Sequence, residues 1–531
     1  MRGHKAFEAV MPMALALMAS LALVGSSQAA PTTATAPGFE VEEATIASVH
    51  AAMRAGRLSC RQLVDAYLDR IAAYDKNGPA VNAIILINPQ AEQEADALDH
   101  RYAEGGFVGP LHCVPLIVKD NFETRGLQTT DGALAFKGYV PDADATMVAR
   151  AKAAGALVLA KSNMAEWAFS PVETVSSILP GYTRNPYDTA RVTAGSSGGT
   201  AAAIAASFGL VGFGSDTGDS IRGPSSHDAL VGIRSTLGLT SRAGIFPLSL
   251  RADVGGPMAR TVADAVAVYQ VILGPDPRDP ATAAAAAHPM PDLAASLDAG
   301  GLRGKRIGVL HEAYDRASLD PEIAALFAAA VDDLRRQGAI IVDPARIEGY
   351  VAPTFPPPGQ ACEGFKYDLN RFLADRVGKV PKANLDAIIA SGEFHPSVAE
   401  RLKAADAAPV NPPGSPACAA DEARRQALRD EVMRTLADMK LDAFVYPTWS
   451  NPPRLIGDLN TPSGDNNQIF SPFTGFPAIQ VPMGYTRGDR LPAGITFFGP
   501  AWSDPELITL AYAYEQATHH RRPPPLAPPL D

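Results

Sequence analysis

The stretch 193–224 constrains the fold most strongly, because two turns of small residues flank one short helix and one short strand. The first turn is Gly195-Ser196-Ser197-Gly198-Gly199 and the second is Asp216-Thr217-Gly218-Asp219-Ser220. Between them lie an Ala-rich segment, 200–208, with good helix propensity, and an apolar run, 210–213, typical of a buried strand. A helix between two such turns can bring their hydroxyls together on backbone that lies close to a substrate. The stretch therefore predicts a serine nucleophile, a relay hydroxyl and an oxyanion hole.

A lysine follows an apolar run upstream of this stretch. Val114-Pro115-Leu116-Ile117-Val118 directly precedes Lys119, and four of these five residues are large aliphatics. We expect a buried strand that carries Lys119 at its end. Burial disfavours the charged ammonium and lowers its pKa, so that a neutral amine can act as a general base. Taken alone, each feature has an ordinary explanation: a strand-end charge for Lys119 and a plain turn for the first loop.

Taken together, these and further motifs closely resemble the amidase signature family of serine hydrolases. The resemblance covers roughly residues 40–520 in the family's order. The matching motifs are Pro115-Leu116-Ile117-Val118-Lys119-Asp120, Lys161-Ser162-Asn163-Met164-Ala165-Glu166-Trp167, Thr183-Arg184-Asn185-Pro186, Gly195-Ser196-Ser197-Gly198-Gly199, Asp216-Thr217-Gly218-Asp219-Ser220-Ile221-Arg222, Gly256-Pro257-Met258-Ala259-Arg260-Thr261-Val262-Ala263-Asp264 and Phe470-Ser471-Pro472-Phe473-Thr474-Gly475-Phe476-Pro477.

The resemblance implies a Ser–cisSer–Lys triad made of Ser220, Ser196 and Lys119. Neutral Lys119 draws a proton through Ser196 from Ser220, and Ser220 attacks an amide carbonyl to form an acyl-enzyme. Water then releases the acid by the same relay. Esters are a second possible substrate, because the same acyl chemistry serves both. Neither a cofactor nor a metal is expected.

The resemblance also assigns supporting roles. Backbone N–H groups of Thr217, Gly218, Asp219 and Ser220 would form the oxyanion hole, and one such donor contributes roughly 3 kcal/mol to lowering the barrier. Ser197, Asp216 and Arg222 would hold the serine loop in place through a polar network. Trp167, Ala168 and Phe169 match the region that lines the family's acyl pocket and suit an apolar or aromatic substrate, although core packing explains them equally well.

Two positions depart from the family pattern. Where Gly-Gly-Ser is usual, this chain has Gly218-Asp219-Ser220. The Asp219 side chain either points away and leaves activity intact, or it opposes the developing negative charge and yields a catalytically impaired, amidase-like binding protein. Where many members have Phe-Cys-Gly, the chain has His227-Asp228-Ala229. His227 either lines the pocket or is a structural histidine.

Two further alternatives come from the motifs. The first loop also fits a Gly-x-Ser-x-Gly nucleophile elbow, which would make Ser197 the nucleophile. That motif needs a preceding strand and a histidine partner, and the segment 184–191, with Pro186 and Asp188, is a poor strand. The amidotransferase subunit that acts on mischarged tRNA shares the fold that the resemblance implies. Its chemistry is cytoplasmic, so an export signal argues against it.

Apolar runs alternate with helical patterns along the chain, which favours an α/β sheet covered by helices. The resemblance implies the amidase signature fold, in which a central mixed β-sheet is covered on both faces by α-helices. We expect one catalytic domain over 39–522, with a breaker-rich, variable substrate-side region at 349–440 and a Pro-rich tail at 523–531. The net charge of −11 does not indicate a nucleic-acid partner. A small amide is the expected substrate, and a homodimer is left open.

The N-terminus predicts export. Arg2 and Lys5 precede an apolar segment, 11–25, and Ser27-Gln28-Ala29 offers a cleavage site after residue 29. We therefore expect a signal peptide over 1–29, a flexible lead-in over 30–38, a periplasmic or secreted protein and no stable membrane insertion. The chain has four cysteines. The pair Cys362 and Cys418 is the candidate for one disulfide, whereas Cys113 is expected to be simply buried.

Overall fold

The computed structural model describes residues 39–347, 362, 364–410 and 413–530. The expected signal peptide and lead-in lie outside the described residues, as does part of the variable region. The described residues, from Phe39 onward, form one compact unit. No helix within the described ranges is long and apolar enough to cross a membrane.

Eleven strands of the described chain form one mixed sheet in the order β1-β3-β2-β6-β8-β7-β12-β13-β11-β9-β10. The pairs β3–β2, β2–β6, β11–β9 and β9–β10 are parallel, and the others are antiparallel. The strands are β1 (Ile84–Ile87), β2 (Pro115–Lys119), β3 (Leu157–Ser162), β6 (Val211–Asp216), β7 (Val231–Arg234), β8 (Val254–Ala259), β9 (Arg306–Leu310), β10 (Ile340–Ala345), β11 (Ala443–Pro447), β12 (Ala478–Thr486) and β13 (Leu491–Phe498), with β4 (Arg184–Asn185) and β5 (Asp188–Val192) in a separate two-stranded sheet.

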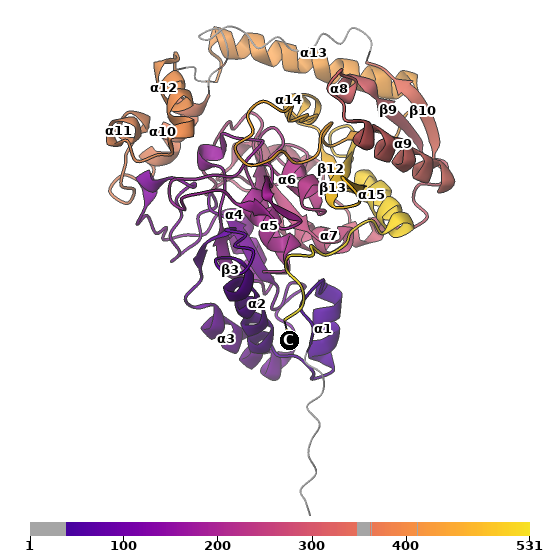
Figure 1. The fold of residues 1–531 in the computed structure, drawn as a ribbon. Coiled ribbons are helices and arrows are strands. Elements are labelled where there is room, and N and C mark those ends of the chain that lie inside the picture. The colour runs from indigo at the N-terminus through magenta and orange to yellow at the C-terminus, as the bar shows by residue number, and fades with distance from the viewer. Residues whose placement is uncertain (1–38, 348–361, 363, 411–412, 531) are drawn as a thin grey trace, which may run out of the picture. The chain divides into compact units, whose positions relative to one another are not determined.

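Helices flank the central sheet, as the sequence predicts (Figure 1). Helices α5 and α6 contact each other; α5 also contacts β2 and β6, and α6 contacts β7 and β13. A second group of helices is formed by α7, which contacts α4 and α15, and by α9, which contacts α15. The helices are α1 (Ile46–Arg54), α2 (Cys60–Tyr74), α3 (Ala91–Gly105), α4 (Thr146–Ala153), α5 (Gly198–Ala205), α6 (Arg222–His227), α7 (Val262–Ile272), α8 (His311–Tyr314), α9 (Pro321–Arg336), α10 (Phe365–Ala374), α11 (Leu385–Ser391), α12 (Ala399–Ala407), α13 (Pro416–Asp438), α14 (Phe470–Thr474) and α15 (Asp504–Thr518), with 3-10 turns η1 (Leu134–Phe136), η2 (Glu166–Ala168), η3 (Pro280–Ala287), η4 (Leu293–Ser296) and η5 (Pro396–Val398).

Local sequence signals explain several element boundaries. Ser59 caps α2: its hydroxyl accepts a hydrogen bond from the Gln62 N–H, and the Gln62 side chain accepts one from the Ser59 N–H. These two reciprocal hydrogen bonds form a capping box. Strand β2 is buried along its whole length because it lies between two parallel neighbours, β3 and β6, which explains its continuous apolar run.

The parallel pairing of β2 with β6 positions the candidate site. Leu116 pairs with Val211 and Val118 with Phe213, so the carboxyl ends of the two strands meet at one edge of the sheet. Lys119 ends β2 and Asp216 ends β6. Helix α5 starts beside them, and it packs so closely that a Cβ at position 199 would lie 2.2 Å from the Asn163 carbonyl oxygen. Only glycine fits at this contact.

Two disulfides are present, whereas the sequence led us to expect one. Cys362 is bonded to Cys418, the expected pair, and Cys60 is bonded to Cys113. The expectation that Cys113 is simply buried was wrong, because β2 begins beside the N-terminus of α2, which no local pattern reveals. The Pro-rich tail is also anchored: Arg70 donates hydrogen bonds to the carbonyl oxygens of Ala527 and Pro528.

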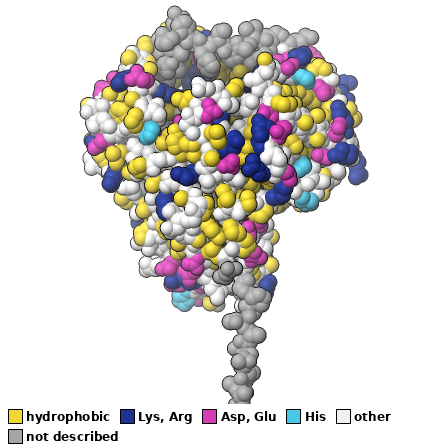
Figure 2. Space-filling model, viewed as in Figure 1, with side chains coloured by type: hydrophobic (Ala, Val, Ile, Leu, Met, Phe, Trp, Pro, Cys, Tyr) yellow, Lys and Arg dark blue, Asp and Glu magenta, His cyan; other side chains and the backbone are white. Residues whose placement is uncertain are grey.

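Acidic and basic side chains are interspersed on the face shown in Figure 2. That face does not present the continuous basic surface that is typical of a nucleic-acid interface.

Candidate active site

Lys119 and Ser196 meet at the buried edge of the sheet. The Lys119 Nζ lies 2.6 Å from Ser196 Oγ and 2.8 Å from Ser215 Oγ, and the Asn121 side chain donates a hydrogen bond to the same Ser215 hydroxyl. Both Lys119 and Ser196 are fully buried. The Gly195–Ser196 peptide bond is cis. The amine is therefore fixed between two hydroxyl groups, one of which belongs to the predicted relay.

Burial lowers the pKa of Lys119 to about 7, because the ammonium loses its hydration. The carboxyl groups of Asp131, Asp216 and Asp253 oppose this shift without cancelling it. A substantial fraction of the amine is therefore neutral near pH 7. A neutral amine can accept a proton from a hydroxyl at hydrogen-bonding distance.

Ser220 lies at the wall of a large pocket, and the loop before it offers free donors. Ser220 is 5% exposed. In the described chain, the backbone N–H groups of Thr217, Gly218, Asp219 and Ser220 donate no hydrogen bond. Within the described chain, the Lys119 amine bonds to Ser196 and Ser215 and not to the Ser220 hydroxyl. Four consecutive unused N–H groups beside a pocket match the chemistry of an oxyanion hole.

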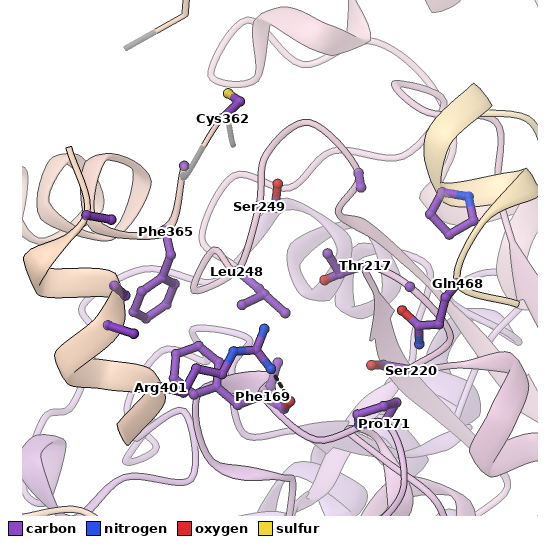
Figure 3. Close-up of a pocket in the computed structure, with 18 of the residues that line it drawn as sticks. Phe169, Pro171, Thr217, Ser220, Leu248, Ser249, Cys362, Phe365, Arg401 and Gln468 are labelled. Atoms are coloured by element: carbon purple, nitrogen blue, oxygen red, sulfur yellow. Dashed lines mark hydrogen bonds between the residues drawn. The ribbon is translucent and has the colours of Figure 1, made fainter. Parts of the chain in front are cut away.

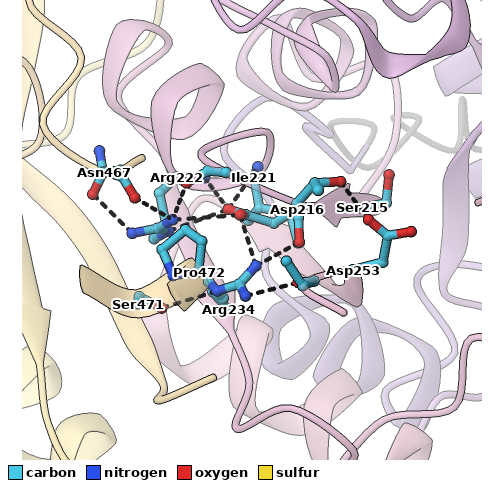
Figure 4. A network of polar contacts seen from close by, with 12 residues as sticks. Ser215, Asp216, Ile221, Arg222, Arg234, Asp253, Asn467, Ser471 and Pro472 are labelled. Carbon is cyan, nitrogen blue, oxygen red and sulfur yellow. Dashed lines mark hydrogen bonds and ion pairs between the residues drawn. The ribbon is translucent and has the colours of Figure 1, made fainter. Parts of the chain in front are cut away.

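A buried charge network holds this loop (Figure 4). The Asp216 carboxylate forms ion pairs with Arg222 at 3.2 Å and with Arg234 at 2.9 Å, and it also accepts a hydrogen bond from the Ile221 N–H. Burial would raise the pKa of Asp216, but the two guanidinium groups outweigh it and lower the value to about 2. Arg222 in turn donates to the Gly218 carbonyl at 2.6 Å. Ser197 donates to the carbonyl oxygen of Ser215 at 3.2 Å.

The Asp219 side chain points away from the pocket. It is fully buried, and a Cβ on Gly223 would lie 2.1 Å from its Oδ2, so the carboxyl group fills the space beside that glycine at the start of α6. Its φ lies outside the left-handed region that favours glycine. The carboxyl group therefore does not occupy the oxyanion position, and the backbone accepts a side chain here.

The pocket has a volume of about 1060 Å³ and mostly apolar walls (Figure 3). Ser220, Thr217 and Gln468 lie on one side, and Phe169, Phe365 and Arg401 on the other. The Arg401 guanidinium stacks over the Phe169 ring at 4.2 Å. Further apolar lining comes from Ala168, Pro171, Leu248, Pro472 and Phe473. This wall suits an extended substrate with apolar groups.

Two predicted pocket residues need correction. Trp167 does not line the pocket: its ring is fully buried and packs edge-on against Phe136 at 5.5 Å. His227 does not line it either, because it is buried at the end of α6 with its ring 4.6 Å from that of Trp449. Burial lowers the pKa of His227 to about 3, so this histidine is neutral. Both side chains pack in the interior behind the site, and Ala168 and Phe169 are the predicted residues that reach the pocket.

The nucleophile-elbow alternative has no structural support at Ser197. Residues 188–192 do form a strand, contrary to expectation, but it belongs to the small β4–β5 sheet. Ser197 is fully buried and is absent from the pocket lining.

Sequence reasoning missed several residues of the site. Ser215 and Asn121 orient Lys119, and Arg234 is the second partner of Asp216. Asn121 directly follows the motif 115–120 that contains Lys119, and this position in the sequence could have identified it as a residue of the site. Arg234, Phe365 and Arg401 come from distant segments without any distinctive local pattern.

The comparisons with known proteins agree with this geometry. The amidase family model matches residues 62–508. The Arabidopsis thaliana protein named "Probable amidase" is 34% identical over 96% of both chains. The A subunit of the glutamyl-tRNA(Gln) amidotransferase from Acidothermus cellulolyticus is 35% identical, covering 89% of this chain and 94% of its own. The crystal structure of native peptide amidase from Stenotrophomonas maltophilia superposes with a TM-score of 0.80 at 38% identity, covering 91% of this chain and 98% of that one. The chain therefore belongs to the amidase (amidase signature) family, whose members hydrolyse amide C–N bonds.

Proposed function

We propose that the protein is an exported amidase that cleaves a carboxamide through an acyl-enzyme on Ser220, with Ser196 as proton relay and Lys119 as base. The observation that carries this proposal is the 2.6 Å contact between the buried Lys119 amine and Ser196 Oγ. It lies beside a pocket that contains Ser220 and a run of unused N–H groups.

The reaction proceeds in two halves. Neutral Lys119 takes the proton of Ser196, Ser196 takes that of Ser220, and Ser220 Oγ bonds to the amide carbon. The N–H groups of residues 217–220 stabilise the resulting oxyanion. The C–N bond breaks as the proton returns to the leaving nitrogen. Water then attacks the acyl-enzyme, the same relay removes its proton, and the acid leaves Ser220 with its hydroxyl restored. The hydrogen bond from Ser220 Oγ to Ser196 Oγ forms when the substrate binds, because catalytic hydrogen bonds are often long without substrate and shorten in its complex.

The substrate is the terminal carboxamide of an extended acyl group, such as a C-terminally amidated peptide with apolar residues. The large apolar pocket supports this choice, and so does the 38% identity to a peptide amidase. Ammonia release from amidated peptides that end in Phe-NH2 or in Gly-NH2, compared with simple aryl amides and esters, tests it. Faster turnover of acetamide than of every peptide amide would reject the peptide substrate.

Variants test the mechanism directly. Lys119→Ala, Ser196→Ala and Ser220→Ala should each lower kcat by at least about 10²-fold, the scale of general-base catalysis, while the exposed Lys137→Ala should not. A fluorophosphonate should label Ser220, as read by peptide mass spectrometry. Full activity in Ser220→Ala would overturn the mechanism. The Asp219 side chain points away from the pocket, which supports an active enzyme over a catalytically impaired binding protein.

Export follows from the N-terminal pattern and is supported by the two disulfides, which are typical of oxidising compartments. Mass analysis of protein recovered from the periplasm or medium should give a mature chain that begins at Ala30. Recovery of the uncleaved chain from the cytoplasm alone would reject export. The homodimer remains a prediction that light scattering can test.

A further inference from the structure

The Asp219 carboxyl group is buried beside the nucleophile without a conventional partner. Neither of its oxygens accepts a hydrogen bond from any described residue. Its position is nevertheless fixed, because it occupies the space that Gly223 leaves open at the start of α6, next to the Trp449 indole nitrogen. A buried carboxylate without donors is strongly disfavoured, so this group needs a proton or a partner.

The group that faces Asp219 is a second carboxyl, Asp465. Asp465 pairs through an isolated β-bridge with Trp449, whose indole nitrogen lies beside the Asp219 carboxyl group, and the two carboxyl groups raise and lower each other's pKa as hydrogen-bonding partners. Asp465 already accepts two hydrogen bonds, from the Asn467 N–H at 2.9 Å and from the Gln468 side-chain amide at 2.5 Å. Two facing carboxyl groups cannot both be ionised at low cost, and a single shared proton turns their repulsion into a hydrogen bond.

The surrounding charged and titratable groups do not supply a cation to Asp219. Arg222 is the cation that favours ionised Asp219, but its guanidinium is used by Asp216, the Gly218 carbonyl and the Asn467 side chain. Tyr446, from β11, donates to the same Asn467 oxygen, and His227, beside Trp449, is neutral. Asp216 adds negative charge that disfavours ionisation of Asp219. In the described chain, the proton is therefore the remaining means of neutralising Asp219.

We propose that Asp219 is a protonated carboxylic acid that donates a hydrogen bond to the Asp465 carboxylate, and that this bond positions the oxyanion loop. Asp219 is a positioning residue, and this role rests on the proposed amide hydrolysis. The bond joins the side chain of Asp219, whose backbone N–H belongs to the predicted oxyanion hole, to the segment 465–468. Within that segment, Asp465 orients Gln468, whose Oε1 lies so close to Gly218 that a Cβ there would be 2.2 Å away. Gln468 also lines the pocket.

The pH dependence has a definite sign. Burial raises the pKa of Asp219, and the Asp465 carboxylate raises it further. The hydrogen bond is therefore intact while pH lies below the folded-state pKa of Asp219, and it is lost as pH rises through that value. Deprotonation would place two carboxylates in contact and push the loop away from the segment 465–468.

Two substitutions that keep a branched side chain of four heavy atoms separate the hydrogen bond from simple packing. Asp219→Asn keeps a donor toward Asp465 at every pH, and Asp219→Leu removes it. We expect Asp219→Asn to keep kcat within about threefold of wild type. Asp219→Leu should lose kcat on the order of 10²-fold, the scale of one oxyanion donor, with a smaller change in KM. Equal losses in both variants would overturn the proposal.

An infrared measurement tests the proton without relying on catalysis. The difference spectrum of wild type minus Asp219→Asn at pH 7 should contain the C=O band of a protonated carboxyl group, whereas a carboxylate band in its place would overturn the proposal. If Asp219→Asn does not fold, Asp465→Asn serves instead, because the substituted amide donates to an ionised Asp219 and the acid band is again lost. The infrared result stands even if Ser220→Ala remains active, so failure of the proposed function is recognised separately.

Discussion

The protonation of Lys119 should control the rate below neutral pH. With a pKa of about 7 rather than the ordinary 10.5, roughly half of the amine is neutral at pH 7, compared with about 1 part in 3000 for an unshifted lysine. At pH 5 the neutral fraction falls to roughly 1%. If the neutral amine is the base, kcat/KM falls about tenfold per pH unit below pH 7.

The assay is hydrolysis of a chromogenic aryl amide between pH 5 and 9, with circular dichroism at each pH to verify the fold. Lys119→Arg is the matched control, because it keeps a cation of similar length that does not deprotonate. It should be as inactive as Lys119→Ala. A flat profile from pH 5 to 8, or an active Lys119→Arg enzyme, would refute the role of a neutral amine.

The same shift has a consequence for stability. Between pH 7 and 10.5 the unfolded chain binds the Lys119 proton more tightly than the folded chain, so the folded state gains stability as pH rises through this window. At pH 7 and below, burial of the protonated amine lowers the free energy of unfolding by an amount that approaches roughly 5 kcal/mol. Lys119→Met should therefore be inactive and yet at least as stable as wild type at pH 6. Its gain in free energy of unfolding over wild type, measured by urea denaturation, should shrink toward pH 10. A Lys119→Met protein several kcal/mol less stable at pH 6 would contradict this.

Two further substitutions probe the loop. Asp216→Asn leaves Arg222 and Arg234 without their buried counterion. It should lower the free energy of unfolding, measured by urea denaturation, by about 3–5 kcal/mol. A loss below about 1 kcal/mol would show that the network contributes little to stability. Gly223→Ala places a Cβ 2.1 Å from the Asp219 carboxyl, so it should abolish activity and lower Tm. The double variant Asp219→Gly/Gly223→Ala should recover Tm, and an equally low Tm in the double variant would locate the collision elsewhere.

The sequence motifs predicted the parts of the site that lie on short, continuous segments. Lys119 follows an apolar strand, and the turn around Ser196 precedes a helix of small residues. The resemblance of these motifs to the amidase signature family then assigned both residues to the triad. The pocket was predicted less well: of Trp167, Ala168 and Phe169, neighbours in sequence, the first packs inward and the other two line the cavity. An apolar side chain suits either side of a pocket wall, so residue type does not reveal which side it takes.

The sequence by itself predicted Lys119, Ser196 and Ser220 as the groups that carry the chemistry, through motifs of a few residues that resemble a known family. It also determined the α/β class, because that depends on local periodicity. Tertiary structure alone decided that Arg234 joins Arg222 on Asp216, that Cys113 bonds to Cys60, and that Asp219 meets Asp465 from a remote part of the chain. These contacts join strands, helices and loops that are far apart in sequence. Their pairing follows from sheet order and burial, which are properties of the packed whole and leave no trace in any single segment.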